Sequence, residues 1–215
     1  GLLYGLTLPP ALPLWMVACG GIIGVALAKF LFGGLGYNAF NPALVGRAFL
    51  QAAFPVAMTS WTPAFVAGRF TGLPASTLTM PFAAPVYDGF SGATALSLGA
   101  AGGLEAITQQ LSWTQAFLGQ MQGSIGEVST LAILLGAALL LWTGIASWRI
   151  MLGVVIGTAA MGLLFNTVGS DTNPMFALPF WWHFVLGGWA FGTVFMATAP
   201  VSAAMTETGK PAFGI

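Results

Sequence analysis

Charge is the scarcest property of this sequence. Only 5 of its 215 residues are Lys or Arg and 5 are Asp or Glu, whereas 57% are hydrophobic and the mean hydropathy is +0.89. A soluble domain of this length carries charge on about a quarter of its residues, so this chain cannot cover itself with a soluble surface. The absence of any basic stretch excludes the electrostatic footprint of a nucleic-acid-binding protein. The composition predicts an all-α integral membrane protein.

Cysteine and histidine are each present once. Cys19 lies in an apolar run, which excludes an internal disulfide and a cysteine cluster for zinc or iron–sulfur. His183 lies in the last apolar stretch, directly after three aromatic residues. It could relay a proton or contact a cofactor. Its aromatic neighbours favour a hydrogen-bonded residue at a helix interface near the outer membrane surface.

Glycine, by contrast, is abundant at 30 residues, and in lipid it permits close packing of helices. A bilayer core about 30 Å thick needs roughly 20 apolar residues per helix. On this basis the sequence predicts a multi-span helix bundle that forms one transmembrane domain over residues 1–215. The predicted spans are 12–33, 41–58, 127–146, 148–168 and 175–198. Because no starting Met or polar tail flanks them, we expect the chain to be the central part of a longer protein.

The long segment 59–126 separates the second and third spans and is rich in Thr, Pro, Gly and Ser. Such a long connection is usually functional. By the positive-inside rule, Arg149 in the short hairpin between two spans faces the cytoplasm, and Lys29 and Lys210 then fall on the same side. Arg69 does not follow this pattern. The same count places segment 59–126 on the outer side of the membrane.

Two Asn-Pro pairs open apolar spans, Asn41-Pro42 after a glycine-rich run and Asn173-Pro174 after another small-residue turn. With the topology above, the two pairs enter the membrane from opposite sides. This arrangement is typical of an inverted repeat with broken helices. An Asn-Pro pair is also an ordinary helix start, so a chance match stays open.

Residues 88–97 form a polar loop of mostly small residues, Asp-Gly-Phe-Ser-Gly-Ala-Thr-Ala-Leu-Ser. The hydroxyl of Thr94 follows Ser91, Gly92 and Ala93, so a modifying enzyme can reach it and a phosphate can lie against bare backbone N–H groups. The same residue types also form ordinary turns. Thr94 is the candidate attachment site, with a plain turn as the alternative.

Four stretches together closely resemble one protein family. They are residues 33–50, 88–97, 123–127 and 196–203. They are similar to the B component of the sodium-translocating NADH:quinone reductase, while the D component of the Rnf ferredoxin:NAD oxidoreductase complex shares the pattern more loosely. The resemblance covers nearly the whole chain, and the phrases at 146–150 and 169–173 favour the quinone reductase.

The resemblance implies an FMN esterified through its phosphate to Thr94. A flavin transferase would attach it by reading the pattern of Asp88, Ser91, Gly92 and Ala93, although Asp88 could equally cap the turn. Isoalloxazine takes one or two electrons, and the protein supplies its position and potential. The family also implies a multi-pass protein of the bacterial inner membrane, with the ubiquinone site on N-terminal helices that this chain lacks.

A second, noncovalent flavin is implied as well. Riboflavin would lie against Asn38 and Asn41, whose amides suit the donors and acceptors of a flavin edge. Both residues could instead cap a broken helix. Arg47 joins the cofactor-binding candidates because a cation within a span must be paired or face a polar cavity. Glu127 is its candidate partner, and a carboxylate near a helix N-terminus is also favourable on its own.

Sodium handling is the remaining implied activity. The resemblance implies a constriction beside the ion path at Phe191 and Phe195, with Glu127 as a further candidate. A Phe pair at this spacing is also ordinary helix packing, and no residue is a certain metal ligand. Ala199 stands where the family has an Asp, and an alanine methyl offers sodium no oxygen.

The function that follows is a membrane redox subunit. It would transfer electrons toward quinone within an NADH:quinone reductase and couple this transfer to sodium translocation. Its partners would be the other membrane, flavin and iron–sulfur subunits of the complex and the lipid bilayer. The chain has no NADH-binding fingerprint, so it would not be catalytic alone. Alternatives are the Rnf component, a channel or transporter of similar fold without a redox role, and a protein that only anchors its partners.

Overall fold

The computed structural model describes residues 1–34, 36–38, 40–62, 64, 76–81, 83, 94–170 and 172–215. Across these ranges every regular element is a helix and no strand is present, as the composition predicts. The chain divides into two compact units, Gly1–Gly92 with Gln122–Gly126, and Ala93–Met121 with Glu127–Ile215. Five positions named above lie outside the described residues: Arg69, Asp88, Ser91, Gly92 and Ala93.

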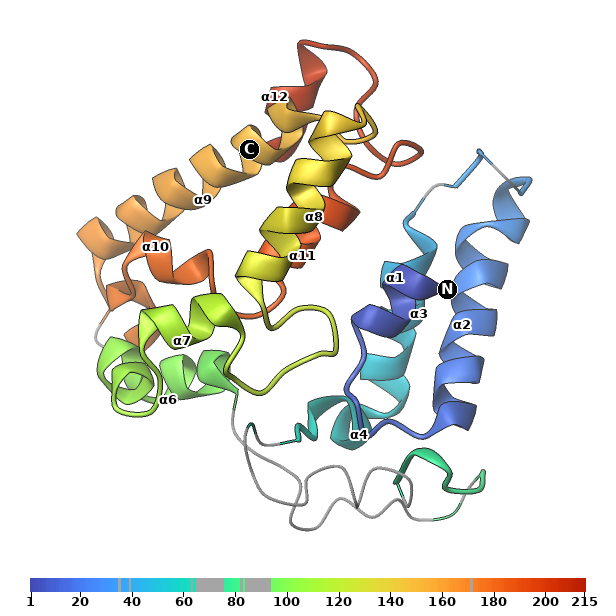
Figure 1. Ribbon diagram of the computed structural model, residues 1–215, viewed down its shortest axis with the longest axis horizontal. Helices are drawn as coiled ribbons and strands as arrows, with labels where there is room; N and C mark the ends of the chain where they lie inside the picture. The colour runs from blue at the N-terminus through green and yellow to red at the C-terminus, as the bar shows by residue number, and fades with distance from the viewer. Residues whose placement is uncertain are drawn as a thin grey trace. The chain divides into compact units, whose positions relative to one another are not determined.

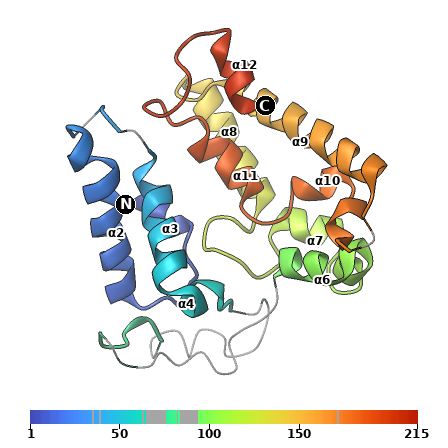
Figure 2. The same ribbon diagram turned by 180° about the vertical axis from the view of Figure 1, so that it is seen from behind.

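The first unit contains two longer apolar helices that lie side by side (Figures 1 and 2). Its helices in chain order are α1 (Leu2–Leu6), α2 (Leu14–Ala28), the 3-10 turn η1 (Phe30–Phe32), α3 (Pro42–Ala53) and α4 (Pro55–Thr59). Its buried core joins α1, α2, α3 and α4 and comprises Tyr4, Leu8, Leu12, Met16, Leu50, Ala57 and Met58. The α2–α3 pair is therefore the frame of this unit.

Glycine allows α2 and α3 to approach closely. A Cβ atom added at Gly24 would lie only 2.5 Å from the Pro42 carbonyl oxygen, and one added at Gly46 would lie 2.7 Å from the Gly20 carbonyl oxygen. Backbone therefore packs on backbone across this interface. Small residues at helix contacts are the usual device in lipid, where no hydrophobic force drives helices together.

A proline ends α3. Phe54 departs from helical geometry (φ −134°, ψ 58°) because Pro55 disfavours the α conformation in the residue before it, and α4 starts at that proline. The predicted span 41–58 is thus divided between a 12-residue helix and a 5-residue helix. At about 1.5 Å per residue, α3 alone is about 18 Å long, shorter than a bilayer core.

The second unit contains the longest helix of the described residues, Trp148–Val168 with 21 residues. Its elements are α6 (Ala95–Thr108), α7 (Trp113–Leu118), α8 (Thr130–Trp142), α9 (Trp148–Val168), the 3-10 turn η2 (Pro174–Ala177), α10 (Phe180–His183), α11 (Trp189–Phe191), the π-helix η3 (Gly192–Met196) and α12 (Gly209–Gly214). Helices α9 and α12 lie side by side in both views (Figures 1 and 2). One core cluster joins α6, α7 and α10 through Ala95, Ile107, Leu111, Ala116, Leu178, Trp182, Val185 and Leu186.

In the second unit, the helix bounds match one predicted span and divide another. Helix α9 occupies 148–168, as expected, and α8 covers 13 residues of the range 127–146. The range 175–198 is split among η2, α10, α11 and η3. Prolines begin η2 and precede α10, and Gly187 takes a positive φ of 58° between α10 and α11. The range predicted as one span therefore consists of several short helical segments, and whether it crosses the membrane stays a prediction.

Within the described residues, two helical stretches are long and apolar enough to cross a membrane, Leu14–Phe32 and Trp148–Val168. Large apolar side chains on α8 are exposed, including Leu135 at 67% and Trp142 at 87%. Exposed apolar surface of this kind is unfavourable in water, and lipid would cover it. The number of spans and the inverted repeat stay predictions.

Candidate functional site

Thr94 is the N-cap of α6. Its backbone is extended (φ −71°, ψ 155°), and its Oγ1 accepts a hydrogen bond from the Ser97 backbone N–H at 3.2 Å. The Ser97 hydroxyl donates to the Thr94 carbonyl at 2.8 Å. The Thr94 side chain is half-buried. Helix α6 thus fixes the orientation of the Thr94 hydroxyl without enclosing it.

This position suits a phosphoester. The first N–H groups of a helix have no intrahelical acceptor, and the helix dipole places partial positive charge at the same end. A phosphate carried on Thr94 Oγ1 would be stabilised by both. The cap also explains the Ser97 hydrogen bonds without any phosphate. Sequence reasoning did not anticipate the cap, although a Thr followed by a run of small and apolar residues is a helix-start signal.

The helix that carries Thr94 is anchored in the second unit. Ala95, the residue after the cap, and Ile107, near the end of α6, are both buried in the core cluster. Between them the helix is kinked at Gly102 and Gly103, and Gly103 has a positive φ of 66°. A Cβ at Gly103 would lie 3.2 Å from the Pro174 carbonyl oxygen, so this glycine allows α6 to pack on η2. Thr94 is therefore at the start of a helix that is packed into the core.

Asn41 and Asn38, the riboflavin candidates, differ in their hydrogen bonding. Asn41 is the N-cap of α3, and its Oδ1 accepts from the Ala43 N–H at 3.0 Å. The capping alternative therefore describes part of its role. The Oδ1 atom of Asn38 is buried and has no hydrogen-bond partner among the described residues. Because a buried unpaired acceptor is costly, Asn38 fits a donor such as a flavin N–H or ribityl hydroxyl.

Arg47 lies in the middle of α3 and is partly buried. Its helix, α3, has Asn41 as N-cap. Arg47 belongs to the first unit, whereas Glu127 belongs to the second. The predicted Arg47–Glu127 pair therefore stays a prediction.

Glu127, Phe191 and Phe195 belong to one unit, as the sequence-based ion path requires. Glu127 is only 8% exposed, and its carboxylate lies against the backbone of Gly188, where an added Cβ would be 2.9 Å from Oε1. Gly188 is the N-cap of α11, the short helix that ends at Phe191. The rings of Phe191 and Phe195 are in contact, with centroids 4.9 Å apart.

Buried hydroxyl groups near these residues were missed by sequence reasoning. Thr130, Thr193 and Thr198 are all at most 8% exposed, on or next to α8 and η3. Thr193 donates to the Trp189 carbonyl at 2.8 Å and Thr198 to the Val194 carbonyl at 2.6 Å. Their oxygen atoms keep acceptor capacity. A π-helix such as η3 is rare and is often found at functional sites, and no sequence pattern signals it here.

Ala199 lies directly after this segment, and its backbone N–H donates to the Met196 carbonyl at 3.2 Å. Its methyl group contributes no oxygen, in agreement with the substitution noted above. Among the described residues of this region, Glu127, the threonine hydroxyls and backbone carbonyls carry oxygen atoms of the kind that sodium prefers.

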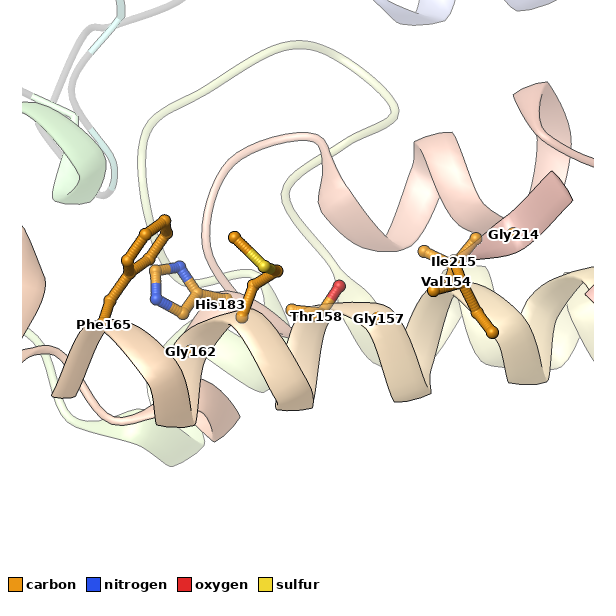
Figure 3. Close-up of a pocket in the computed structure, with 9 residues that line it drawn as sticks. Val154, Gly157, Thr158, Gly162, Phe165, His183, Gly214 and Ile215 are labelled. Atoms are coloured by element: carbon orange, nitrogen blue, oxygen red, sulfur yellow. The ribbon is translucent and has the colours of Figure 1, made fainter. Parts of the chain in front are cut away.

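His183 lines a separate cavity of about 350 Å³ along α9. Figure 3 shows its imidazole beside the Phe165 ring at one end, with Gly214 and Ile215 at the other. The remaining lining is apolar or glycine apart from Thr158, whose Oγ1 accepts a hydrogen bond from Trp189 Nε1 at 2.8 Å. His183 thus lies beside Phe165 of α9, while its predicted hydrogen bond and the proton-relay alternative stay predictions.

The sequence also matches known proteins over its whole length. The family model described as the NQR2, RnfD, RnfE family matches residues 1–215. Three similar proteins are each named as the B component of the Na(+)-translocating NADH-quinone reductase. They are from Azotobacter vinelandii (54% identical, covering 99% of this chain and 48% of that protein), Pseudomonas aeruginosa (54%, 99% and 48%) and Chromohalobacter salexigens (53%, 99% and 47%). The chain thus spans about half the length of the curated relatives it matches.

Proposed function

The chain belongs to the NQR2, RnfD, RnfE family, and on this premise we propose that it is the flavin-carrying part of the B component of a sodium-translocating NADH:quinone reductase. It transfers electrons toward a quinone and takes part in sodium translocation. The observation that carries the proposal is the place of Thr94, a half-buried hydroxyl fixed at the N-terminus of α6.

Thr94 holds FMN through a phosphoester. The attached flavin supplies one- and two-electron chemistry. The chain's own part is to position it: α6 presents the hydroxyl, its free N–H groups neutralise the phosphate, and the kink at Gly103 allows α6 to pack on η2. A covalent link also keeps the cofactor at the site at high local concentration. Asp88, Ser91, Gly92 and Ala93 are proposed to be the pattern read by the flavin transferase.

Asn38 contacts riboflavin through its buried Oδ1, which lacks a partner among the described residues. Asn41 caps α3 and places the following turn, while Arg47 supplies a cation on the same helix. This assignment predicts that the amide of Asn38 matters more for riboflavin than the amide of Asn41, whose oxygen is already used by the cap.

Sodium passes a polar region formed by Glu127 and the hydroxyls of Thr193 and Thr198, next to the aromatic pair of Phe191 and Phe195. Carboxylate and hydroxyl oxygens are the ligands that a hard cation prefers. With Ala199 in place of the family's carboxylate, Glu127 is the acidic group of this region. The other subunits of the complex, a quinone and the bilayer of a bacterial inner membrane are its proposed partners and surroundings, with Thr94 on the outer side.

The test separates the flavin role of Thr94 from its capping role. Asn is as good an N-cap as Thr but offers no hydroxyl to esterify, so Thr94→Asn keeps α6 and removes the attachment point. The full-length protein is expressed with its flavin transferase and analysed by intact mass and by in-gel fluorescence after denaturation. We expect the mass of FMN and fluorescence in the wild type, and neither in Thr94→Asn, with both forms folding and assembling equally.

A matched control is Ser97→Ala, which removes the neighbouring hydroxyl and leaves Thr94 intact. It is expected to keep the FMN mass. If Thr94→Asn keeps covalent fluorescence, or if the wild type never acquires the added mass, the flavin assignment is wrong and a channel or anchoring role is favoured.

A further inference from the structure

A cavity of about 560 Å³ lies at the α8–α9 turn of the second unit, and its lining includes Thr198 but neither Thr94 nor Glu127. Among its described lining residues, the charged side chains are Arg149, Lys210 and Glu207. Glu207 pairs with both cations: one carboxylate oxygen contacts Arg149 Nη1, and the other accepts from Lys210 Nζ at 2.5 Å. Two cations face one carboxylate, which leaves one positive charge in excess.

Hydrogen-bonding capacity is also in excess here. A guanidinium has five N–H donors and an ammonium three, so one carboxylate cannot saturate both. Ser147, the N-cap of α9, makes no side-chain capping bond, and it lines the same cavity. The first N–H groups of α9, a helix whose first residues line this cavity, therefore lack a side-chain acceptor. All of these groups favour one ligand, an anion with several oxygen acceptors and a single charge, which describes a phosphodiester.

The surroundings identify the source of that phosphodiester. Three apolar side chains in the lining are strongly exposed, Ile145 at 62%, Trp148 at 57% and Met205 at 85%. The adjoining helices α8 and α9 also carry exposed leucines. A free phosphate ion would leave these apolar side chains exposed, whereas the acyl chains of a phospholipid would cover them. Basic pockets beside membrane helices are known binding sites for anionic headgroups, and tryptophans mark the membrane interface.

We propose that the cavity formed by Arg149, Lys210 and the N-terminus of α9 binds the headgroup of an anionic phospholipid, with the acyl chains along α8 and α9. Arg149 is held for this role by the ring of Trp148, whose centroid lies 5.6 Å from the guanidinium carbon, while the Glu207 carboxylate competes with the headgroup for the same cation. The site does not depend on flavin attachment. It does require that the α8–α9 hairpin lies in the bilayer.

The test uses the complete complex containing the full-length protein. The complex is purified in a nonionic detergent and equilibrated with equal amounts of phosphatidylglycerol and phosphatidylcholine. Native mass spectrometry then counts the lipid that stays on this protein as the complex is dissociated. We expect one retained phosphatidylglycerol. Arg149→Gln and Lys210→Gln should each weaken its retention about fivefold, the factor that corresponds to about 1 kcal/mol per basic residue at an anionic lipid surface.

Glu207→Gln provides the opposite change, which loss of folding cannot imitate. It removes the competing carboxylate and should strengthen retention by a similar factor. Lys29→Gln, a cation of the first unit, is the matched control and should leave retention unchanged. Equal retention of phosphatidylcholine, Arg149→Gln within twofold of wild type, or weaker retention in Glu207→Gln would overturn the proposal. Adducts of inorganic phosphate without lipid, or dissociation of a neighbouring protein of the complex in Arg149→Gln, would overturn it too.

Discussion

The contact between α2 and α3 makes a strong prediction about riboflavin, through Gly24. A Cβ atom at this position would lie 2.5 Å from the Pro42 carbonyl oxygen, 2.9 Å from the Gly46 nitrogen and 3.0 Å from the Gly46 Cα. All three atoms are backbone, so none can rotate away. In Gly24→Ala the two helices must therefore separate, and the N-terminus of α3, which Asn41 caps, must move with them.

The size of the effect follows from this geometry. Inserting a methyl group into a well-packed contact typically costs about 1–3 kcal/mol, and each kcal/mol lowers the melting temperature by about 2–4 °C in a domain of this size. Because Asn38 and Asn41 lie directly before α3 or at its start, the variant should also lose noncovalent riboflavin. The proposed covalent FMN on Thr94 should remain, since Thr94 belongs to the other unit.

Gly21→Ala is a control on the same helix. An added Cβ there has one neighbour within 4 Å, Tyr4 Cε1 at 3.6 Å, which is an ordinary contact. Melting curves of the purified complex, riboflavin released by denaturation and in-gel FMN fluorescence would be measured for both variants. Equal stability of Gly24→Ala and Gly21→Ala would refute the packing argument. Joint loss of both flavins in Gly24→Ala would refute the assignment of riboflavin to the first unit.

Two further variants test the second unit. Asn166→Leu removes the amide that donates to the Phe176 and Leu178 carbonyls at 2.6 and 3.1 Å. It should lower the free energy of unfolding by about 2 kcal/mol because two acceptors lose their donor. Thermal unfolding measures this loss, and an unchanged melting temperature would contradict it. Gly136→Ala brings a Cβ to 3.0 Å from Phe195 Cζ, the free end of a ring that can move. Gly136→Ala should lower the free energy of unfolding by less than about 1 kcal/mol. If the ring borders the ion path, the variant should still change the sodium dependence of quinone reduction. A wild-type sodium response would show that Phe195 is not part of that path.

Composition and helical length made the class of structure and the range of α9 predictable. The range 148–168 is mostly apolar and contains no proline, so hydropathy and backbone propensity both favour one helix there. The range 175–198 is equally apolar, but Pro179 and the pair Gly187-Gly188 interrupt it, and average hydropathy does not register backbone breaks. The end of α3 before Pro55 could have been predicted by the same rule.

Candidate residues could be predicted where they stand in a local sequence motif. Their contacts and burial could not be predicted where these depend on residues far apart in the sequence. Thr94 and Asn41 stand out in their motifs, and both prove to be helix N-caps. The contact of the Glu127 carboxylate with Gly188 joins residues far apart in the sequence. The unpaired oxygen of Asn38 is likewise a property of burial. No local pattern encodes either of them.

This chain has few charged side chains with which to bind polar ligands. Helix N-termini offer another source of hydrogen-bond donors and of partial positive charge. Thr94, Asn41 and Ser147 each stand at the start of a helix, where backbone N–H groups lack acceptors and partial positive charge accumulates. These backbone groups avoid the cost of placing a full charge in lipid. Phosphate, flavin and lipid headgroup are all rich in hydrogen-bond acceptors. Helix ends would therefore suit the ligands proposed above, and Pro42, Pro55 and Pro174, each of which starts a helical segment, add to the number of such ends.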